Sequence, residues 1–182
     1  PEGRSGPLRR RRLVEDNRPD FYVSLGLATG ETVLRFETTA INRVDFGVAD
    51  NEGARPTDGG PIEPGGPPAR FATWDAAALA GELLENDLPA IVSHHAGTHL
   101  CNLVLYCAAG AMARAGLEGP VGFLHLPYTP KQVARFLRNG PPGGDTAPMT
   151  PRALPSMPLE TQEAALRLTL AGLVRQLSGL DA

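Results

Sequence analysis

The chain has 182 residues, of which 42% are hydrophobic, and this composition suits one domain with a sizeable core. Its formal net charge of -3 provides no overall attraction to nucleic acid or to an anionic membrane surface. No apolar run approaches the roughly 20 residues that a membrane-spanning helix needs, so we expect neither nucleic acid nor a membrane as partner.

The first residues are strongly basic and contain four consecutive arginines, Arg9 to Arg12. No aromatic residues are interleaved with them, and the chain as a whole is acidic, so we interpret them as a solvated surface segment. The stretch lacks the apolar core of a secretory signal, and two cysteines are too few for a disulfide framework. We therefore expect a cytoplasmic protein with reduced thiols.

Two β-rich runs come next, at residues 20–30 and 32–42, and both are predicted to be sheet strands. We expect the first of them to be a buried central strand. Residues 49–70 contain the clusters DNEG, DGGP and EPGGPP, whose glycines, prolines and acidic residues are typical of turns. This segment is predicted to be one long surface loop.

An amphipathic helix is predicted over residues 73–86, with Thr73 as its N-cap and with Leu79, Leu83 and Leu84 on its apolar side. The short apolar run that follows, residues 89–93, is typical of a buried strand.

The run LCNLVLYCAAGAMARAG predicts a second helix that ends near Gly116, and residues 120–127 predict a further strand. Strand, helix and strand in succession suggest a crossover between parallel strands. We therefore predict an α/β fold, specifically a three-layer α/β/α sandwich around a twisted, largely parallel mixed sheet. In such folds, sites gather at the carboxyl ends of the strands.

The rest of the chain is predicted to contain a second long loop, residues 139–155, and a terminal helix over residues 159–177 that Pro158 opens. No internal repeat or domain-sized linker interrupts the pattern. Residues 1–182 are accordingly interpreted as a single domain.

Three of the four histidines and one cysteine crowd into the stretch SHHAGTHLCNLVLY, residues 93–106. If Thr98 caps the following helix, Cys101 falls in its first turn, where free N–H groups and the helix dipole favour a thiolate. Cys107 comes six residues later, about 240° around the helix, and is predicted to be inert filler.

A thiolate nucleophile needs a proton shuttle, and His125 lies at the carboxyl end of the strand predicted over residues 120–127. A histidine base in turn needs an acceptor that fixes its tautomer. Glu37 is the carboxylate that is flanked by strand residues instead of loop residues. The residues thus suggest a Cys101, His125 and Glu37 constellation, although a histidine at a strand end is more often only structural.

Several separate motifs resemble the pyroglutamyl peptidase I family of cysteine peptidases. They are AGTHLCN, GFLHLPYTPKQ, ETTAIN, DNEG, SLGLATG and PSMPLE, and they span the chain from about Asp20 to its C-terminus. The resemblance implies an intracellular, homo-oligomeric exopeptidase that removes N-terminal pyroglutamate from peptides without a metal or cofactor. It also implies Cys101 as nucleophile, His125 as base, Glu37 as orienting acid, and a substrate pocket formed by Gly26, Leu27, Val48, His99 and Leu100.

The chain also departs from the family pattern. Gly47 stands where the family has an arginine near the oxyanion, Thr38 replaces the arginine after the acid, and His99 takes an aromatic position. The family begins with a strand and a phenylalanine-containing loop that walls the pocket. We expect such a segment upstream of Pro1, which would cover the edge of the strand at residues 20–30.

Three other readings remain open. A metal hydrolase would use His95 and His99, four residues apart, with His94, Cys101 or His125 completing the site. Gly97 interrupts the helix that this pair needs, and the stretch does not match H-E-x-x-H. A serine hydrolase based on Ser93 lacks the flanking glycines of a nucleophile elbow. The third reading is a homologue that keeps the fold but serves only as a binding or structural protein.

Overall fold

The computed structural model describes residues 12–47, 58–140 and 154–179, so Val48 lies outside the described part. Residues 12–17 are helical. In chain order the other elements are β1 (Tyr22–Leu27), β2 (Leu34–Glu37), β3 (Thr39–Ile41), β4 (Ala69–Phe71), α2 (Ala76–Glu85), β5 (Ala90–Ser93), α3 (Leu100–Arg114), β6 (Val121–Leu126), α4 (Pro130–Asn139) and α5 (Leu159–Ser178). Within these ranges no helix is both long enough and apolar enough to cross a membrane.

The central sheet is mixed and mostly parallel, as predicted. Its strand order is β1-β6-β2-β5, in which β1 pairs parallel with β6 and β2 parallel with β5, while β2 and β6 are antiparallel. A small antiparallel pair, β3 with β4, stands beside it. The sheet therefore contains two parallel pairs of opposite direction, joined in the middle.

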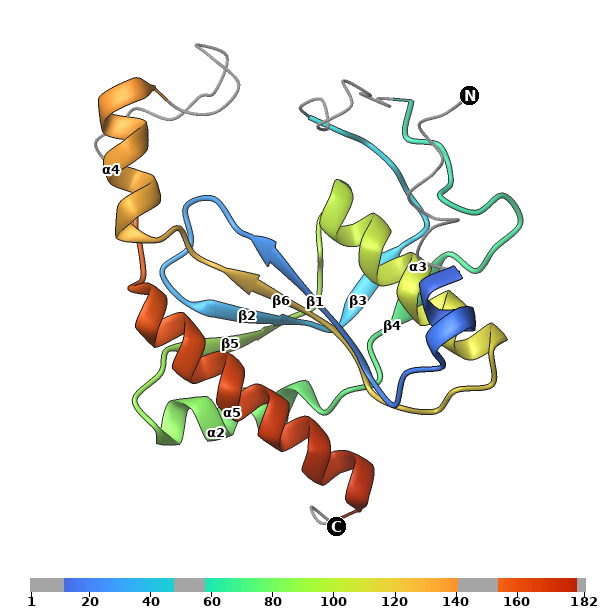
Figure 1. The fold of residues 1–182 in the computed structure, drawn as a ribbon. Helices are drawn as coiled ribbons and strands as arrows, with labels where there is room; N and C mark the ends of the chain where they lie inside the picture. The colour runs from blue at the N-terminus through green and yellow to red at the C-terminus, as the bar shows by residue number, and fades with distance from the viewer. Residues whose placement is uncertain (1–11, 48–57, 141–153, 180–182) are drawn as a thin grey trace.

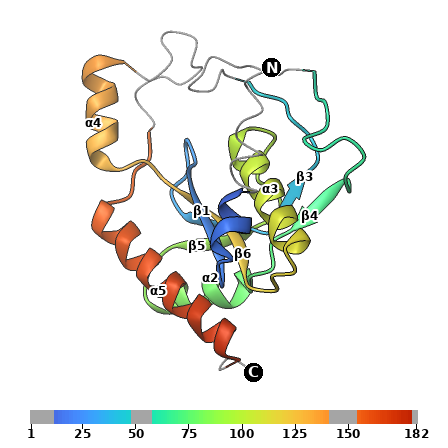
Figure 2. The ribbon, with the colours of Figure 1, turned by 45° about the vertical axis from the view of Figure 1, so that its right-hand side comes forward.

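Helices cover both faces of this sheet, which confirms the three-layer α/β/α prediction (Figure 1). On one face, Leu34, Phe36 and Leu124 pack with residues of α2 and α5. On the other, Val121 and Phe123 pack with α3, and the short helix at residues 12–17 adds Val14 to the same cluster. The turned view in Figure 2 shows α3 and α5 on opposite sides of the strands. Alternate residues of β6 thus serve two separate cores, whereas β2 contributes apolar residues to the first of them.

The predicted crossover between parallel strands is wrong at one point. The strands that flank α3 are β5 and β6, which are not neighbours and run in opposite directions, because β2 lies between them and is parallel to β5 but antiparallel to β6. As a result, the carboxyl ends of β1 and β6 lie at one end of the sheet and those of β2 and β5 at the other.

Strand boundaries also differ from the prediction. The run at residues 32–42 is two strands, β2 and β3, which belong to different sheets and are separated at Thr38. The end of the predicted 49–70 loop forms the start of β4, and residues 48–57 lie outside the described part. In the described chain β1 is an edge strand with half-exposed Leu25 and Leu27, so the prediction of a buried central strand is wrong there.

The predicted N-caps of two helices were wrong. Asp75, not Thr73, caps α2, because the Thr73 side chain instead bonds the backbone of Gly119 and Val121 at the start of β6. His99 occupies the N-cap position of α3, and the Thr98 hydroxyl donates to the carbonyl of Asp45. Threonines that precede a helix thus tie it to neighbouring segments.

Three further predictions concern the apolar side of α2, the terminal helix and the loop at residues 139–155. Leu79 and Leu83 are buried as expected, whereas Leu84 is exposed. The terminal helix is confirmed as α5, with Pro158 at its N-cap position. Of the predicted loop at residues 139–155, residues 141–153 lie outside the described part.

Candidate active site

Glu37 and His125 meet on the sheet face that α3 covers. In the antiparallel pairing of β2 with β6, Glu37 lies opposite Phe123 and is therefore one diagonal step from His125 on the same face. The distance from Glu37 Oε1 to His125 Nδ1 is 2.7 Å, and the Glu37 side chain is fully buried. A hydrogen bond this short, made away from water, fixes the orientation of the imidazole ring.

Cys101 reaches the same histidine from the helix side. It is the second residue of α3, and its side chain lies near enough to His125 to raise the pKa of that histidine. The neighbouring strand β1 makes room for the sulfur, because a Cβ added at Gly26 would lie 3.1 Å from Cys101 Sγ and would also collide with Phe123. Cys107 is buried two turns further along α3. The structure thus brings Cys101, His125 and Glu37 together and separates Cys107 from them.

The electrostatics of this group favour a charged histidine. Burial by itself would lower the pKa of His125, but hydrogen bonds with Cys101 and Glu37 and the negative charges of both groups raise that pKa to about 9. The imidazolium form is therefore the main form at neutral pH. A cysteine beside a protonated histidine that a buried carboxylate orients is the arrangement that acyl transfer by a cysteine requires.

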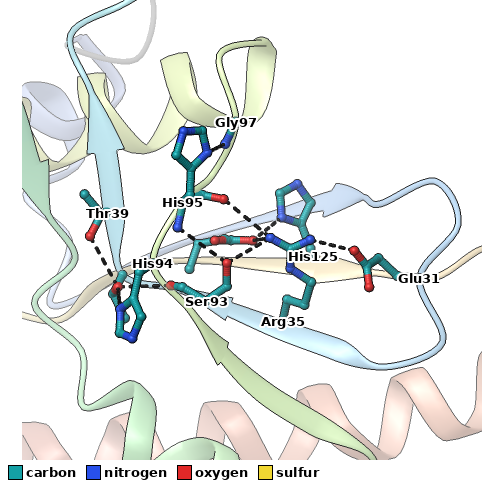
Figure 3. Close-up of polar contacts among 10 residues, drawn as sticks. Glu31, Arg35, Thr39, Ser93, His94, His95, Gly97 and His125 are labelled. Carbon is teal, nitrogen blue, oxygen red and sulfur yellow. Dashed lines mark hydrogen bonds and ion pairs between the residues drawn. The ribbon is translucent and has the colours of Figure 1, made fainter.

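The sequence analysis missed Arg35, which is central to the geometry. The residue lies opposite His125 in the β2–β6 register, and its Nη2 atom is 3.1 Å from Glu37 Oε1 and 2.8 Å from Ser93 Oγ. Its Nη1 atom is 2.6 Å from Glu31 Oε1 (Figure 3). In LRFE the apolar Leu34 and Phe36 alternate with charged residues, so the sequence places Arg35 and Glu37 on one face of β2 but does not show what Arg35 contacts.

Asn102 is a second residue that the sequence analysis missed. Its amide is fully buried, accepts from the Ile41 N–H at 2.8 Å, and donates to the carbonyls of Ile41 and Arg43. These bonds fasten the residue after Cys101 to the end of β3. Thr98 and Asp45 exchange two further bonds just before the helix. The first turn of α3 is consequently held on both sides of the cysteine.

The residues predicted to line a substrate pocket lie partly around this group. Gly26 is beside the sulfur, and Leu100 is the first residue of α3, next to Cys101. The ring of His99 stacks on Phe46 with centroids 4.2 Å apart. Leu27 follows Gly26 on β1, so its half-exposed side chain lies on the other face. A Cβ at Gly47 would have no atom of the described residues within 4 Å.

The geometry does not favour the alternative sites. His95 lies in the loop before α3 and accepts the Gly97 N–H at 2.8 Å, so His95 and His99 do not share a helical face. The Nδ1 atom of His94 bonds Thr38 Oγ1 at 2.9 Å (Figure 3). Within residues 12–47, 58–140 and 154–179 there is no group of three potential metal ligands. The Ser93 hydroxyl bonds the guanidinium of Arg35 and not a histidine ring.

Comparison with known proteins identifies a family for this chain. Residues 8–176 match the pyroglutamyl peptidase family. The pyrrolidone-carboxylate peptidase of Pyrococcus furiosus is 32% identical over 90% of this chain and 74% of its own length. Pyrrolidone-carboxylate peptidase 1 of Ralstonia nicotianae is 38% identical over 91% of this chain and 69% of its own.

Solved structures with a similar fold are also pyrrolidone carboxyl peptidases. The solved structure of the pyrrolidone carboxyl peptidase from Thermococcus litoralis superposes with a TM-score of 0.82 at 30% identity, covering 95% of this chain and 74% of that one. A P. furiosus pyrrolidone carboxyl peptidase structure with the substitution A199P has the same TM-score at 29% identity, over 94% of this chain and 76% of that one. Together with the family match and the relatives of similar sequence, this shows that the chain belongs to the pyroglutamyl peptidase family.

Proposed function

We propose that this protein hydrolyses the amide bond that follows an N-terminal pyroglutamate in peptides, and that Cys101, His125 and Glu37 carry the reaction. The observation that supports the proposal most strongly is the position of His125, which lies near enough to Cys101 for that side chain to raise its pKa and is 2.7 Å from the buried Glu37 carboxylate. In this arrangement a nucleophile, a proton carrier and an orienting acid stand in sequence.

In the proposed first step, the Cys101 thiolate attacks the carbonyl carbon of the pyroglutamyl residue. The C–N bond then breaks as the leaving amine takes a proton from protonated His125, and a pyroglutamyl thioester remains on the sulfur. In the second step His125 takes a proton from water, the hydroxide attacks the thioester, and pyroglutamate and the thiolate are released. Glu37 holds Nδ1 throughout, so that Nε2 is the nitrogen that transfers protons.

Negative charge develops on the carbonyl oxygen in both steps. The unpaired backbone N–H groups at the start of α3, including that of Cys101, are suited to receive it. Each such donor contributes on the order of 3 kcal/mol to transition-state stabilisation. Because Gly47 replaces the arginine expected near this oxygen, we propose that the helix terminus carries the larger share here.

A pyroglutamyl ring has no charged amine, so its pocket needs apolar walls and a few backbone groups. The Phe123 ring and the Cys101 sulfur both lie close against the β1 backbone at Gly26, so Phe123 is the apolar wall that the structure offers beside the sulfur. The backbone of Leu100 at the helix start is a suitable partner for the ring. This recognition predicts that prolyl peptides, whose ring nitrogen is charged, are poor substrates.

The pH dependence follows from the raised pKa of His125. We expect kcat/KM to fall on the alkaline side with a midpoint near pH 9, because loss of the imidazolium proton removes the acid that protonates the leaving amine. Glu37→Gln should move this midpoint to lower pH, because it removes a hydrogen bond and a charge that raise the pKa of His125.

The raised pKa of His125 in the wild type also affects stability. Its contribution to the stability of the folded state is fully present below about pH 6.5 and is lost as the pH rises through 9. Thermal melts across this pH range check the change in stability. Profiles of kcat/KM against pH for the wild type and Glu37→Gln, measured with a substrate that does not titrate, check the two kinetic midpoints.

The direct test is turnover of a fluorogenic pyroglutamyl amide by the purified protein, with the prolyl and open-chain glutamyl amides of the same fluorophore as controls. The proposal expects hydrolysis of the pyroglutamyl compound and at least about a hundredfold preference over the controls, because a misplaced polar or charged group in the pocket costs several kcal/mol. Binding of pyroglutamyl peptides with no turnover would instead favour a homologue that serves as a binding protein.

A further inference from the structure

We propose that Arg35 is a positioning residue of this site, whose guanidinium anchors the Glu37 carboxylate and the loop before Cys101 and limits how strongly Glu37 attracts His125. Where turnover is the readout, this inference rests on the proposed function. Where the titration of His125 is the readout, the inference does not depend on the proposed function.

Arg35 connects three segments of the site. Its Nη2 atom contacts Glu37 Oε1 at 3.1 Å within β2, and Ser93 Oγ at 2.8 Å at the end of β5. The same atom lies 3.4 Å from the carbonyl oxygen of His95, in the loop that leads to α3 (Figure 3). A single side chain therefore touches the orienting acid and the segment that carries the nucleophile.

Two cationic side chains contact the same oxygen of the Glu37 carboxylate. One oxygen, Oε1, receives both His125 Nδ1 at 2.7 Å and Arg35 Nη2 at 3.1 Å. The other oxygen, Oε2, and the Nε atom of Arg35 are buried without a hydrogen-bond partner among the described residues. Since two cations draw on the same lone pairs, the Arg35 contact weakens the His125 contact.

The charged side chains around Glu37 and His125 alternate in sign. Going outward from the helix, the described structure places Cys101, His125, Glu37, Arg35 and Glu31 in contact one after another. From β5 and its following loop only the neutral Ser93 hydroxyl and the His95 carbonyl reach Arg35, and Gly26 is the β1 residue beside the sulfur. Among the described residues, removal of Arg35 would leave His125 as the one cation in contact with the fully buried Glu37 carboxylate.

The test is an NMR titration of the His125 ring, assigned by comparison with His125→Gln, in the wild type and in Arg35→Met. The inference expects the titration midpoint of His125 to rise in Arg35→Met by about one pH unit, because the uncompensated carboxylate then attracts the imidazolium more strongly. This direction is opposite to that expected for Glu37→Gln. An unchanged or lowered midpoint in a folded Arg35→Met protein would overturn the inference.

Arg70→Met is the matched control. Arg70 is also mostly buried and pairs with Glu63 at 2.8 Å, but it contacts Tyr106 in the middle of α3 in place of the catalytic group. We expect this change to lower stability and to leave the His125 midpoint where it is. A shift of equal size in both variants would mean that the effect is a general consequence of losing a buried arginine, and the inference would fail.

Turnover and a conservative replacement supply the second readout. Arg35→Met should lower kcat about tenfold with little change in KM, as expected for misalignment of catalytic groups without loss of substrate contacts, and Arg35→Lys should recover part of the loss. If no pyroglutamyl amide is turned over by the wild type, the proposed function fails while the titration still decides the role of Arg35.

If Arg35→Met does not fold, Glu31→Gln takes its place. That change removes the anion at the outer end of the guanidinium, so Arg35 should pull harder on Glu37 and the His125 midpoint should fall, by less than one pH unit because Glu31 is partly exposed. A midpoint that rises or does not move in Glu31→Gln would contradict the inference.

Discussion

Replacing Cys101 with alanine is expected to abolish hydrolysis of a pyroglutamyl amide, with kcat falling by about 10⁴-fold or more. The change removes the only atom in the group that forms the covalent bond, and the backbone N–H groups that remain act on a carbonyl with no positioned nucleophile. Steady-state kinetics with the fluorogenic amide, together with a thermal melt to show that the variant folds, measures the effect.

Cys107→Ala is the matched control, since it removes the same thiol group from the same helix. Cys107 is buried and faces away from His125, so its loss should leave kcat within about twofold of the wild type and cost only a small amount of stability. An alkylating reagent should label Cys101 in preference to Cys107. Equal labelling of the two, or an active Cys101→Ala protein, would rule out the thiol mechanism.

The second large effect is expected at the histidine. His125→Ala should lower kcat by about 10³-fold or more, because the variant has no group that moves a proton between the thiol, the leaving amine and water. Glu37→Gln should cost less, about a hundredfold, because glutamine keeps a polar contact to Nδ1 but loses the charge that stabilises the imidazolium.

The order of these two effects is the informative result, and it can be measured in one kinetic series with chelator present and absent. Chelation should leave all rates unchanged. A Glu37→Gln loss larger than that of His125→Ala would mean that Glu37 acts directly on the substrate. Stoichiometric zinc that leaves together with activity would favour a metal hydrolase.

The elements that the sequence predicted well are those whose apolar pattern is decided locally. The strand at residues 120–127 and the helix after His99 are nearly continuous apolar runs, because β6 is buried on both faces and α3 packs against the sheet. The terminal helix was equally clear, with Pro158 at its start. Burial of whole segments leaves a strong signal in one sequence.

Pairing between distant segments was harder to predict. The directions of β2 and β6 are set by register contacts between residues about 90 positions apart, and no local pattern reports them. The interpretation of β5, α3 and β6 as a parallel crossover failed for this reason. Helix α4 was missed although its start carries a capping box, in which the Thr129 side chain accepts from the Gln132 N–H and the Gln132 side chain accepts from the Thr129 N–H.

The same contrast between local and long-range signals applies to the residues of the candidate site. Cys101 and His125 could be proposed from chemistry, because thiol and imidazole at a helix start and a strand end have few other joint uses. Arg35 and Asn102 could not, since an arginine in a strand and an asparagine in a helix are ordinary until their partners are known. Two of those partners come from distant parts of the chain, because Ser93 is 58 residues from Arg35 and Ile41 is 61 residues from Asn102.

The covalent intermediate offers the most direct test of the account. The protein is mixed with an activated pyroglutamyl ester, for which formation of the thioester is fast and its hydrolysis is slow, quenched in acid within the first turnover, and mapped by peptide mass spectrometry. The account predicts one added pyroglutamyl group on the peptide that contains Cys101, absent from Cys101→Ala and retained in Cys107→Ala. A burst of product from the wild type with the pyroglutamyl group on another residue, or with Cys101 unmodified, would contradict it.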